Sequence, residues 1–349
     1  MSKSVGNTVD PLKVMETNGA DIIRLWALSV DYTEDHRIGD EILKGVADQY
    51  RKLRNTFRYM LGALDGFGGT GTVPSGTVPN PSATDGTVPE GTVPEVVPYE
   101  DMPELERYVL HLLADLDAKL KVAVNDYDFN SYTRLLSDFA NNDLSAFFFD
   151  IRKDCLYCDV GANAPLGSPK RMAYRTVLDI LFHAMVRYAT PVLVFTAEEV
   201  WGTRFPDAGS VHLLEWPSMP QITGDHAKWE KIRFIRDQVN VELEHIRRSK
   251  EIRSSMEAVV VLGFEPGYED VSNVDWAELL IVSTVYSGVV GSTEAAKFLN
   301  GPVNMKFRDG VRIGVASTTN HKCGRCWRHL PEVTEDGALC GRCDTVLSA

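Results

Sequence analysis

The stretch ILKGVADQYRKLRNTFRYMLGAL, residues 42–64, decides the character of this chain. Its apolar side chains recur every three or four residues, at Ile42, Val46, Tyr50, Leu53, Phe57, Met60 and Leu64. That period places them on one face of an α-helix. Arg51, Arg54 and Arg58 share another face, where they are candidates for phosphate contacts, with a solvated helix face as the alternative. The stretch therefore predicts an amphipathic helix that packs in a helical bundle.

Helical periods continue on the far side of an unusual insert. Residues 68–98 are dominated by Gly, Thr, Val and Pro, and the tetrapeptide Gly-Thr-Val-Pro recurs in them. This composition offers too little apolar surface to offset the entropy of ordering, so it predicts a disordered linker. Further helices are predicted from Pro103 to Leu120, over residues 127–149 and 171–188, and from Phe195 to Trp201, where Thr196 is a candidate N-cap. The fold class is thus mainly α.

The last third of the chain changes pattern. A helix predicted over residues 227–252 is followed by three short apolar runs, at residues 259–262, 279–282 and 311–315. These runs read as strands and indicate a small α+β domain after the helical bundle. Cys155 and Cys158 form a C-x-x-C pair earlier in the chain, and we interpret them as structural because no second pair lies nearby in the sequence.

Composition limits the class of protein. The 349 residues carry a net charge of −13, and a polyanionic partner is repelled at long range, so nucleic-acid binding would need local basic stripes. The sequence has no apolar run long enough to span a bilayer and no secretory signal, which predicts a cytoplasmic protein without a membrane partner. In that reducing compartment, six cysteines indicate metal binding or free thiols.

Four of those cysteines form the sharpest chemical signal. Cys323-x-x-Cys326 and Cys340-x-x-Cys343 have the spacing of a tetrahedral four-thiolate site, for which Zn²⁺ is the best candidate and iron the alternative. Four sulfurs leave no open coordination position, so the metal would be structural. Gly324 and Gly341 are expected to relieve crowding in the two metal turns. Trp327 and Arg328 follow the second cysteine and are candidates for stacking on bases and contacting phosphate, with packing of Trp327 as the alternative.

The N-terminus carries a second candidate site. Lys3, flanked by Ser2 and Ser4, offers an ammonium and two hydroxyls to a polyphosphate. The stretch up to residue 41 resembles the sequence that follows the K-M-S-K-S loop of isoleucyl-tRNA synthetases, which are class I aminoacyl-tRNA synthetases. The matching residues are Ser2-Lys3-Ser4-Val5-Gly6-Asn7, Asp10-Pro11, Gly19-Ala20-Asp21, Arg24-Leu25-Trp26, Ser29, Asp31-Tyr32, Asp35 and Arg37.

Three further segments support the same resemblance. Phe195-Thr196-Ala197-Glu198-Glu199-Val200-Trp201 is similar to a helix of the family's anticodon-binding bundle, and Ser254-Ser255-Met256-Glu257-Ala258 also resembles the family. Bacterial-type members close with a four-cysteine zinc module in which Trp follows the second Cys. The resemblance implies that Lys3 binds the phosphates of ATP, a substrate of the parent enzyme.

The resemblance also implies a division into four parts. Residues 1–38 would be the motif loop and connecting segment, 39–225 the anticodon-binding bundle with its insert, 226–318 the junction domain and 319–349 the zinc module. The family's Rossmann core, H-I-G-H motif and editing domain would precede residue 1. We therefore expect a monomer that binds isoleucine tRNA, lacks catalysis alone and has a missing N-terminal catalytic part as a partner. The alternatives are a free-standing tRNA-binding module and a zinc-stabilised protein-interaction domain.

Overall fold

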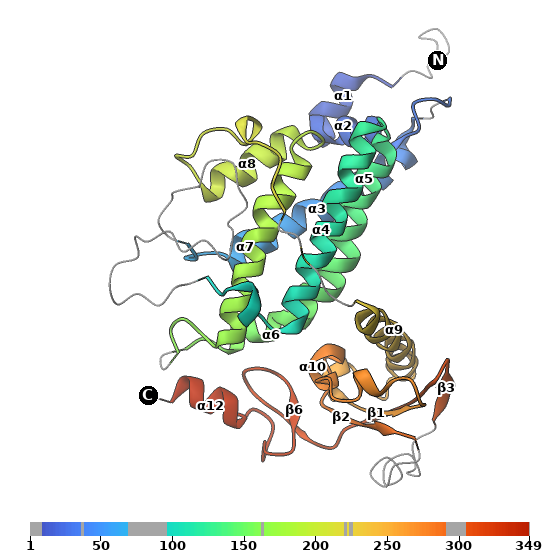
Figure 1. Ribbon diagram of the computed structural model, residues 1–349, viewed down its shortest axis with the longest axis vertical. Helices are drawn as coiled ribbons and strands as arrows, with labels where there is room; N and C mark the ends of the chain where they lie inside the picture. The colour runs from blue at the N-terminus through green and yellow to red at the C-terminus, as the bar shows by residue number, and fades with distance from the viewer. Residues whose placement is uncertain are drawn as a thin grey trace. The chain divides into compact units, whose positions relative to one another are not determined.

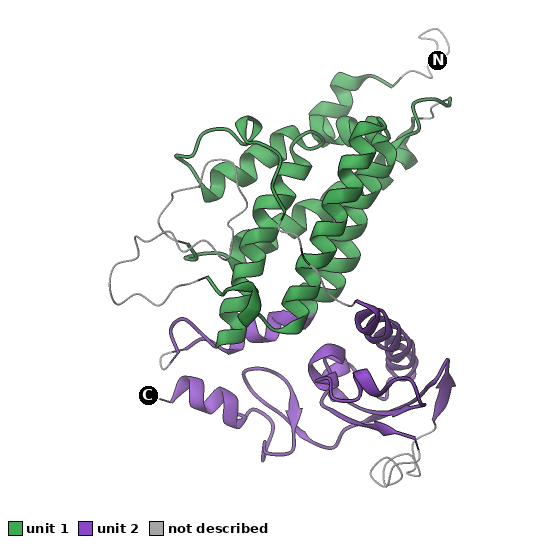
Figure 2. Ribbon diagram, viewed as in Figure 1, with its two compact units in different colours: residues 1–150, 169–223 green, residues 151–168, 224–349 purple. Residues whose placement is uncertain are grey.

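A computed structural model describes residues 9–35, 38–68, 96–161, 164–219, 222, 226–290 and 305–348. The chain divides into two compact units, residues 1–150 with 169–223 and residues 151–168 with 224–349 (Figure 2). Each unit is therefore built from two separate stretches of sequence. Most of the Gly-Thr-Val-Pro insert lies outside the described residues, and the four-part division stays a prediction.

The first unit is helical (Figure 1). Its elements are α1 (Pro11–Asn18), α2 (Ala20–Ser29), α3 (Asp40–Ala63), η2 (Tyr99–Asp101), α4 (Glu104–Asn125), α5 (Phe129–Asp138), the π-helical η3 (Phe139–Phe149), α7 (Pro169–Ala189), α8 (Val194–Arg204) and η4 (Val211–Leu213). Contacts join α4 to α5 and α3 to α7, so these long helices form the bundle. The prediction of a mainly α chain is confirmed. No helix in the described ranges has both the length and the apolar character needed to cross a bilayer.

Helix α3 is the helix predicted from residues 42–64. Five of the predicted apolar residues are buried, namely Val46, Leu53, Phe57, Met60 and Leu64. Leu64 is the C-cap that follows the last helical residue. The first turn differs from the prediction: Ile42 is 38% exposed, whereas Leu43 is 8% exposed. Over two dozen residues the apolar face drifts around the helix, because the three- and four-residue steps only approximate the period of 3.6. The residue that enters the core at the helix start is therefore shifted by one.

The start of α8 corrects another expectation. Thr196 is not the N-cap; Leu193 holds that position and offers no side-chain acceptor. Asp21 of α2 supplies the missing acceptor, because its carboxylate accepts hydrogen bonds from the backbone N–H of Thr196 at 2.8 Å and of Phe195 at 3.3 Å. Capping of the first turn of α8 thus depends on a residue 175 positions away in the sequence.

The second unit contains a small mixed sheet. Its elements are α6 (Asp150–Cys158), α9 (Ala227–Arg248), η5 (Ser255–Glu257), β1 (Ala258–Phe264), η6 (Glu269–Val271), α10 (Trp276–Leu280), β2 (Thr284–Val289), β3 (Lys306–Arg308), β4 (Val311–Ser317), β5 (His321–Lys322), β6 (His329–Leu330) and α12 (Gly341–Leu347). Strand order is β2-β1-β4-β3, with β1 parallel to β2 and the other pairs antiparallel. Helix α9 packs against β4, so the sheet has one helix-covered face.

The register of β1 and β4 explains the buried centre of this sheet. Val260 lies opposite Val315, and Leu262 lies opposite Ile313. Val260, Leu262 and Ile313 are at most 1% exposed. Val261, between Val260 and Leu262, is 4% exposed as well, so both faces of β1 are buried. The strands predicted from the apolar runs at residues 259–262 and 311–315 are confirmed.

The strand predicted at residues 279–282 is wrong. Leu279 and Leu280 end the short helix α10, which Asp275 caps by accepting the backbone N–H of Glu278 at 3.1 Å. Ile281 then adopts a left-handed conformation with φ of 56°, and the strand begins only at Thr284. A four-residue apolar run does not distinguish a buried helix end from a strand, and here the aspartate cap decides for the helix.

Candidate metal centre

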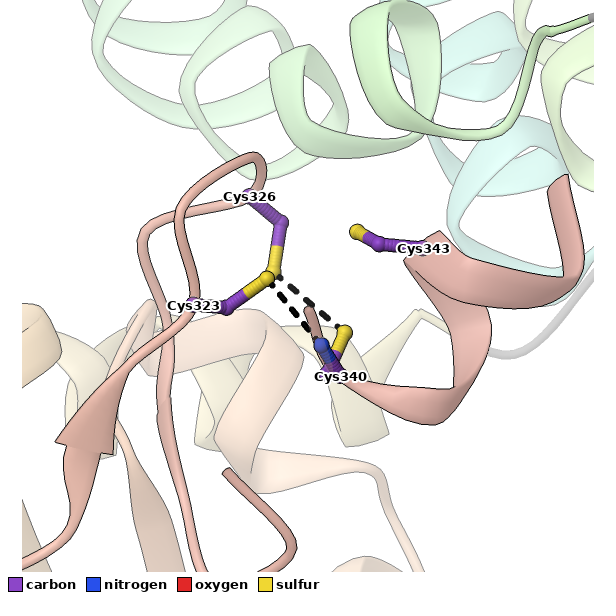
Figure 3. A group of neighbouring side chains, drawn as sticks. All are labelled: Cys323, Cys326, Cys340 and Cys343. Carbon is purple, nitrogen blue, oxygen red and sulfur yellow. Dashed lines mark hydrogen bonds between the residues drawn. The ribbon is translucent and has the colours of Figure 1, made fainter. Parts of the chain in front are cut away.

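The four cysteines predicted as ligands converge on one point (Figure 3). The Sγ atoms of Cys323, Cys326, Cys340 and Cys343 all lie within 4.8 Å of one another, and each side chain is at most 5% exposed. The sulfurs of Cys326 and Cys340 are 3.8 Å apart. Four sulfurs at about 2.3 Å from a central Zn²⁺ on a tetrahedron are about 3.8 Å from one another. The cluster therefore fits a four-coordinate metal, and it has no open position for a substrate.

Backbone N–H groups support negative charge in this cluster. Cys340 donates its N–H to the sulfur of Cys323 at 3.3 Å. Burial raises the pKa of the Cys323 thiol, but hydrogen bonds from the N–H groups of Arg325, Cys326 and Cys340 outweigh burial and lower that pKa to about 6. Burial dominates at Cys343, whose pKa rises to about 11. A metal supplies the positive charge that buried thiolates need, because it binds their deprotonated form.

Two short structures present the ligands. Cys323 and Cys326 lie in the turn between β5 and β6, while Cys340 precedes α12 and Cys343 lies in it. A Cβ atom added to Gly324 would lie 2.5 Å from the carbonyl oxygen of Gly337, so glycine is needed there. A Cβ atom on Gly341 would meet no atom within 4 Å. The expectation that glycine relieves crowding thus holds for the first turn and is wrong for the second.

Cys158 packs beside the four ligands although it belongs to the other C-x-x-C pair. It is buried together with them and Val333 in one cluster. Its helix, α6, also contains Cys155, which is 3% exposed. Burial and then the charge of Asp154 raise the pKa of Cys158 to about 11, which makes it an unreactive thiol. These features agree with a structural role for the pair.

Two arginines attach the metal turns to α6. Arg325 lies inside the first pair and donates to the carbonyl oxygens of Cys158 and Val160, each at 2.6 Å. These contacts satisfy acceptors at and beyond the C-terminal end of the helix, where a cation is favoured. No role was predicted for this residue, although arginine recurs at the same place in both C-G-R-C repeats.

Arg342 occupies the equivalent position in the second pair. It forms a bidentate ion pair with Asp154 at 2.6 and 2.9 Å and a further contact to Asp159 at 3.3 Å. The two aspartates flank the C-x-x-C pair of α6. The four-cysteine turns and α6 therefore form one structure, in which one anchoring arginine lies between the two cysteines of each pair.

Trp327 lies on the outside of the first metal turn. Its side chain is 60% exposed, and the two alternatives, stacking on a base and packing against the turn, both stay predictions. The residue has a left-handed backbone with φ of 63°, and the Nζ atom of Lys322 lies 5.1 Å from its ring centroid. Arg328 follows it and is partly exposed. The turn thus presents an exposed aromatic plane with the cation of Lys322 beside it, and the nucleic-acid contacts of Trp327 and Arg328 stay predictions.

The remaining candidate residues lie elsewhere. Arg51, Arg54 and Arg58 are exposed along α3, in the first unit, and Arg51 pairs with Asp48 at 2.9 Å. This exposure is compatible with phosphate contacts and with a solvated face, so their role stays a prediction. Lys3, Ser2 and Ser4 lie outside the described residues.

Comparisons with known proteins agree with this architecture. A family model described as the anticodon-binding domain of tRNA ligase matches residues 106–262, and the model for class I tRNA synthetases of the I, L, M and V group matches residues 1–39. An isoleucine–tRNA ligase of Zymomonas mobilis is 52% identical, in an alignment that covers 99% of this chain and 33% of that protein. The chain belongs to the isoleucine–tRNA ligase family.

Other members of this ligase family give the same coverage. The isoleucine–tRNA ligase of Gluconobacter oxydans is 42% identical over 100% of this chain and 33% of its own length. The isoleucine–tRNA ligase of Agrobacterium fabrum is 41% identical over 96% of this chain and 31% of its own length. The chain thus spans about one third of the length of the curated ligases it matches. The four cysteines lie outside both matched model ranges but inside the alignment with the Gluconobacter oxydans ligase, which covers the whole chain.

Proposed function

We propose that this chain is the C-terminal, tRNA-binding part of an isoleucine–tRNA ligase. The observation that carries the proposal is the 52% identity to such a ligase over 99% of the chain, together with the anticodon-binding match at residues 106–262. In this proposal the helical bundle binds isoleucine tRNA, and the chain works as a cytoplasmic monomer. Charging with isoleucine requires a catalytic part that this sequence does not contain.

Lys3 has a role only in the complete enzyme. In this proposal its ammonium, with Ser2 and Ser4 beside it, contacts the phosphates of ATP during formation of the isoleucyl adenylate. The parent reaction then transfers the isoleucyl group to the tRNA. The isolated chain is expected to show no isoleucine-dependent exchange of pyrophosphate, because H-I-G-H and a nucleotide-binding core are absent from it.

The metal of the four-cysteine site is proposed to be Zn²⁺. Bound there, it supplies folding free energy and no catalysis, because four thiolates complete a tetrahedral shell. Cys323, Cys326, Cys340 and Cys343 would hold it. In this proposal the metal contributes to function by holding in place the turn that carries Trp327 and Arg328.

The tRNA contacts are proposed at two places. On the bundle, Arg51, Arg54 and Arg58 form an exposed row that suits a phosphate backbone. On the metal turn, Trp327 offers a base-stacking surface and Arg328 a phosphate contact. Local cations of this kind attract phosphate groups at short range and so offset the long-range repulsion expected from the net charge of −13.

A tRNA-binding measurement tests the proposal. The zinc-loaded chain is titrated with labelled isoleucine tRNA and with an unrelated tRNA, at several salt concentrations. We expect preference for isoleucine tRNA and an affinity that falls steeply with salt, because released counterions drive phosphate contacts. Absence of binding even at low salt would contradict the proposal.

Variants then locate the surface. Replacing Arg51, Arg54 and Arg58 by Ala should weaken binding and flatten its salt dependence. The matched control replaces three exposed lysines of the same unit, Lys13, Lys44 and Lys119, and so changes the net charge by the same amount. For Trp327→Ala the control is Phe307→Ala, since Phe307 is a similarly exposed aromatic at 59%. Equal losses in variants and controls would show that the assigned residues are not the contact surface.

A further inference from the structure

Two side chains of helix α2 bind the connection between α7 and α8 and the start of α8, mostly through main-chain groups of those segments. Asp21 and Arg24 lie one turn apart on α2, and residues 190–193 connect the two partner helices. Asp21 is 5% exposed, although a carboxylate is costly to bury without partners. The partners it finds belong to a part of the chain about 170 residues further on, so the contact joins two distant segments of the first unit.

The carboxylate of Asp21 binds the start of α8. One oxygen accepts the backbone N–H of Thr196 at 2.8 Å and the hydroxyl of the same residue at 2.6 Å. The other oxygen accepts the N–H of Phe195 at 3.3 Å. The hydroxyl of Thr196 also lies 3.0 Å from that of Tyr50 on α3. A negative charge is favoured at a helix N-terminus, where the first N–H groups have no partner within the helix.

The guanidinium of Arg24 binds the end of α7. It donates to the carbonyl oxygen of Pro191 at 2.8 Å and to that of Val192 at 3.3 Å. The anion of α2 thus faces N–H groups and the cation faces carbonyl oxygens. If α2 slid along this connection, the carboxylate of Asp21 would lose its N–H donors and the guanidinium of Arg24 would lose its carbonyl acceptors. The two residues therefore define a single register.

The other end of α2 is fastened to α5. Asn130 donates to the carbonyl oxygen of Ser29, and Thr133 donates to that of Leu28 at 3.4 Å. Between the two attachments, Ile22 is 2% exposed and Leu25 is fully buried. Helix α2 is therefore held at both ends and along its apolar face by the bundle.

The position of α2 in the sequence gives this attachment a consequence. Residues 1–39 match the class I synthetase model, whereas α7 and α8 lie within residues 106–262, which match the anticodon-binding model. We infer that Asp21 and Arg24 are positioning residues, which fix the segment that follows Lys3 in one register on the anticodon-binding bundle. The inference rests on the proposed function, and it predicts that a tRNA held by the bundle reaches the catalytic part in one orientation.

The test needs a complete enzyme. The catalytic part of the Zymomonas mobilis relative is joined ahead of Met1, which completes the K-M-S-K-S motif, and the variants are Asp21→Asn, Arg24→Met and Arg24→Lys. Three quantities are measured: the Kd for isoleucine tRNA, isoleucine-dependent pyrophosphate exchange, and kcat for charging of tRNA. Asp10→Asn is the matched control, because Asp10 caps only its own helix, through the N–H of Leu12 at 3.0 Å.

Asp21→Asn and Arg24→Met should lower kcat for charging by roughly tenfold to a hundredfold, the loss expected from a misplacement of about 1 Å. The Kd for tRNA and the exchange rate should stay within about twofold of the unmodified fusion, a change of less than about 0.5 kcal/mol. Arg24→Lys should retain more of the charging rate than Arg24→Met, because lysine keeps a cationic N–H donor for a carbonyl oxygen. Asp10→Asn should change none of the three quantities.

Several results would overturn the inference. Equal loss of exchange, charging and tRNA affinity would show that the two residues only stabilise the fold. Unchanged charging would show that the register does not matter. Amide hydrogen exchange in the isolated chain gives an independent check, since Asp21→Asn should speed exchange at Phe195 and Thr196. Unchanged exchange there refutes the link itself, whereas an unmodified fusion that neither binds nor charges tRNA counts against the proposed function.

Discussion

Gly324→Ala should weaken metal binding strongly, while Gly341→Ala should not. Both glycines occupy the same place in a C-G-R-C repeat, so the pair is matched in sequence. At Gly324 the added Cβ would lie 2.5 Å from the carbonyl oxygen of Gly337 and 3.2 Å from its Cα atom, both of which are backbone atoms. Two segments of main chain must therefore separate by several tenths of an ångström.

That separation strains the hydrogen bonds that join the same segments. Gly324 donates to the carbonyl oxygen of Ala338 at 3.1 Å, and Gly337 donates to that of Lys322 at 2.9 Å. Overpacking costs about 1–3 kcal/mol, and each weakened hydrogen bond adds up to about 1 kcal/mol. The expected total is about 2–4 kcal/mol, which corresponds to a roughly 30- to 900-fold loss of Zn²⁺ affinity if folding of the turns is coupled to binding. At Gly341, alanine in the first turn of α12 should be neutral or stabilise by up to about 1 kcal/mol.

The assay is competition for Zn²⁺ with a chromophoric chelator at fixed pH and temperature. Thermal unfolding in the presence of excess Zn²⁺ reports whether the rest of the chain stays folded. Equal affinity in the two variants would refute the argument, because it would mean that the approach between Gly324 and Gly337 is not enforced by the metal turns. A loss of Zn²⁺ affinity in Gly341→Ala alone would contradict the assignment of the close backbone approach to Gly324.

Further outcomes follow from the same structure. Arg342→Ala and Asp154→Ala should show a coupling energy of about 1–2 kcal/mol in a double-mutant cycle of urea unfolding, reduced by added salt because the pair is partly exposed. Cys326→Ser should abolish stoichiometric Zn²⁺ binding, whereas Cys158→Ser should leave one metal per chain by elemental analysis. Burial lowers the pKa of His183 from 6.5 to about 4. At pH values between these two, His183 is neutral in the folded chain and takes up a proton when the chain unfolds. Stability should therefore fall by roughly 3 kcal/mol as the pH drops from 6.5 to 4, and His183→Phe should flatten that slope in chemical denaturation measured at each pH.

The sequence predicted most of the helices and the convergence of four cysteines. Periodicity identified α3, α4, α7 and α9 because their apolar faces are long, and the two C-x-x-C pairs identified the cysteine cluster because few other patterns have that spacing. The candidate tRNA contacts and Lys3 stay predictions. Their chemistry is readable in the sequence, but which of these side chains contact tRNA or ATP is not.

Two wrong predictions and one missed set of contacts share a cause. Thr196 resembles an N-cap locally, yet the acceptor comes from Asp21 in a distant helix. Residues 279–282 are apolar enough for a strand, yet Asp275 turns them into the end of a helix. Arg325 and Arg342 were visible in the repeats, but their partners on α6 are set by tertiary contacts. In each case a long-range or capping interaction decides what a local pattern leaves open.

The anchoring of α6 has a consequence for how the chain is made. Its last residue, Cys158, leaves the ribosome roughly 185 residues before Cys343, an interval of about 10–40 s at about 5–20 residues per second. During that time the bundle on both sides of α6 can fold, while Arg325 and Arg342 do not yet exist. The thiol of Cys158 gains the neighbours that bury it only when the final turns emerge. Synthesis of this chain thus passes through a stage in which α6 is complete but its cysteine-rich cover is not.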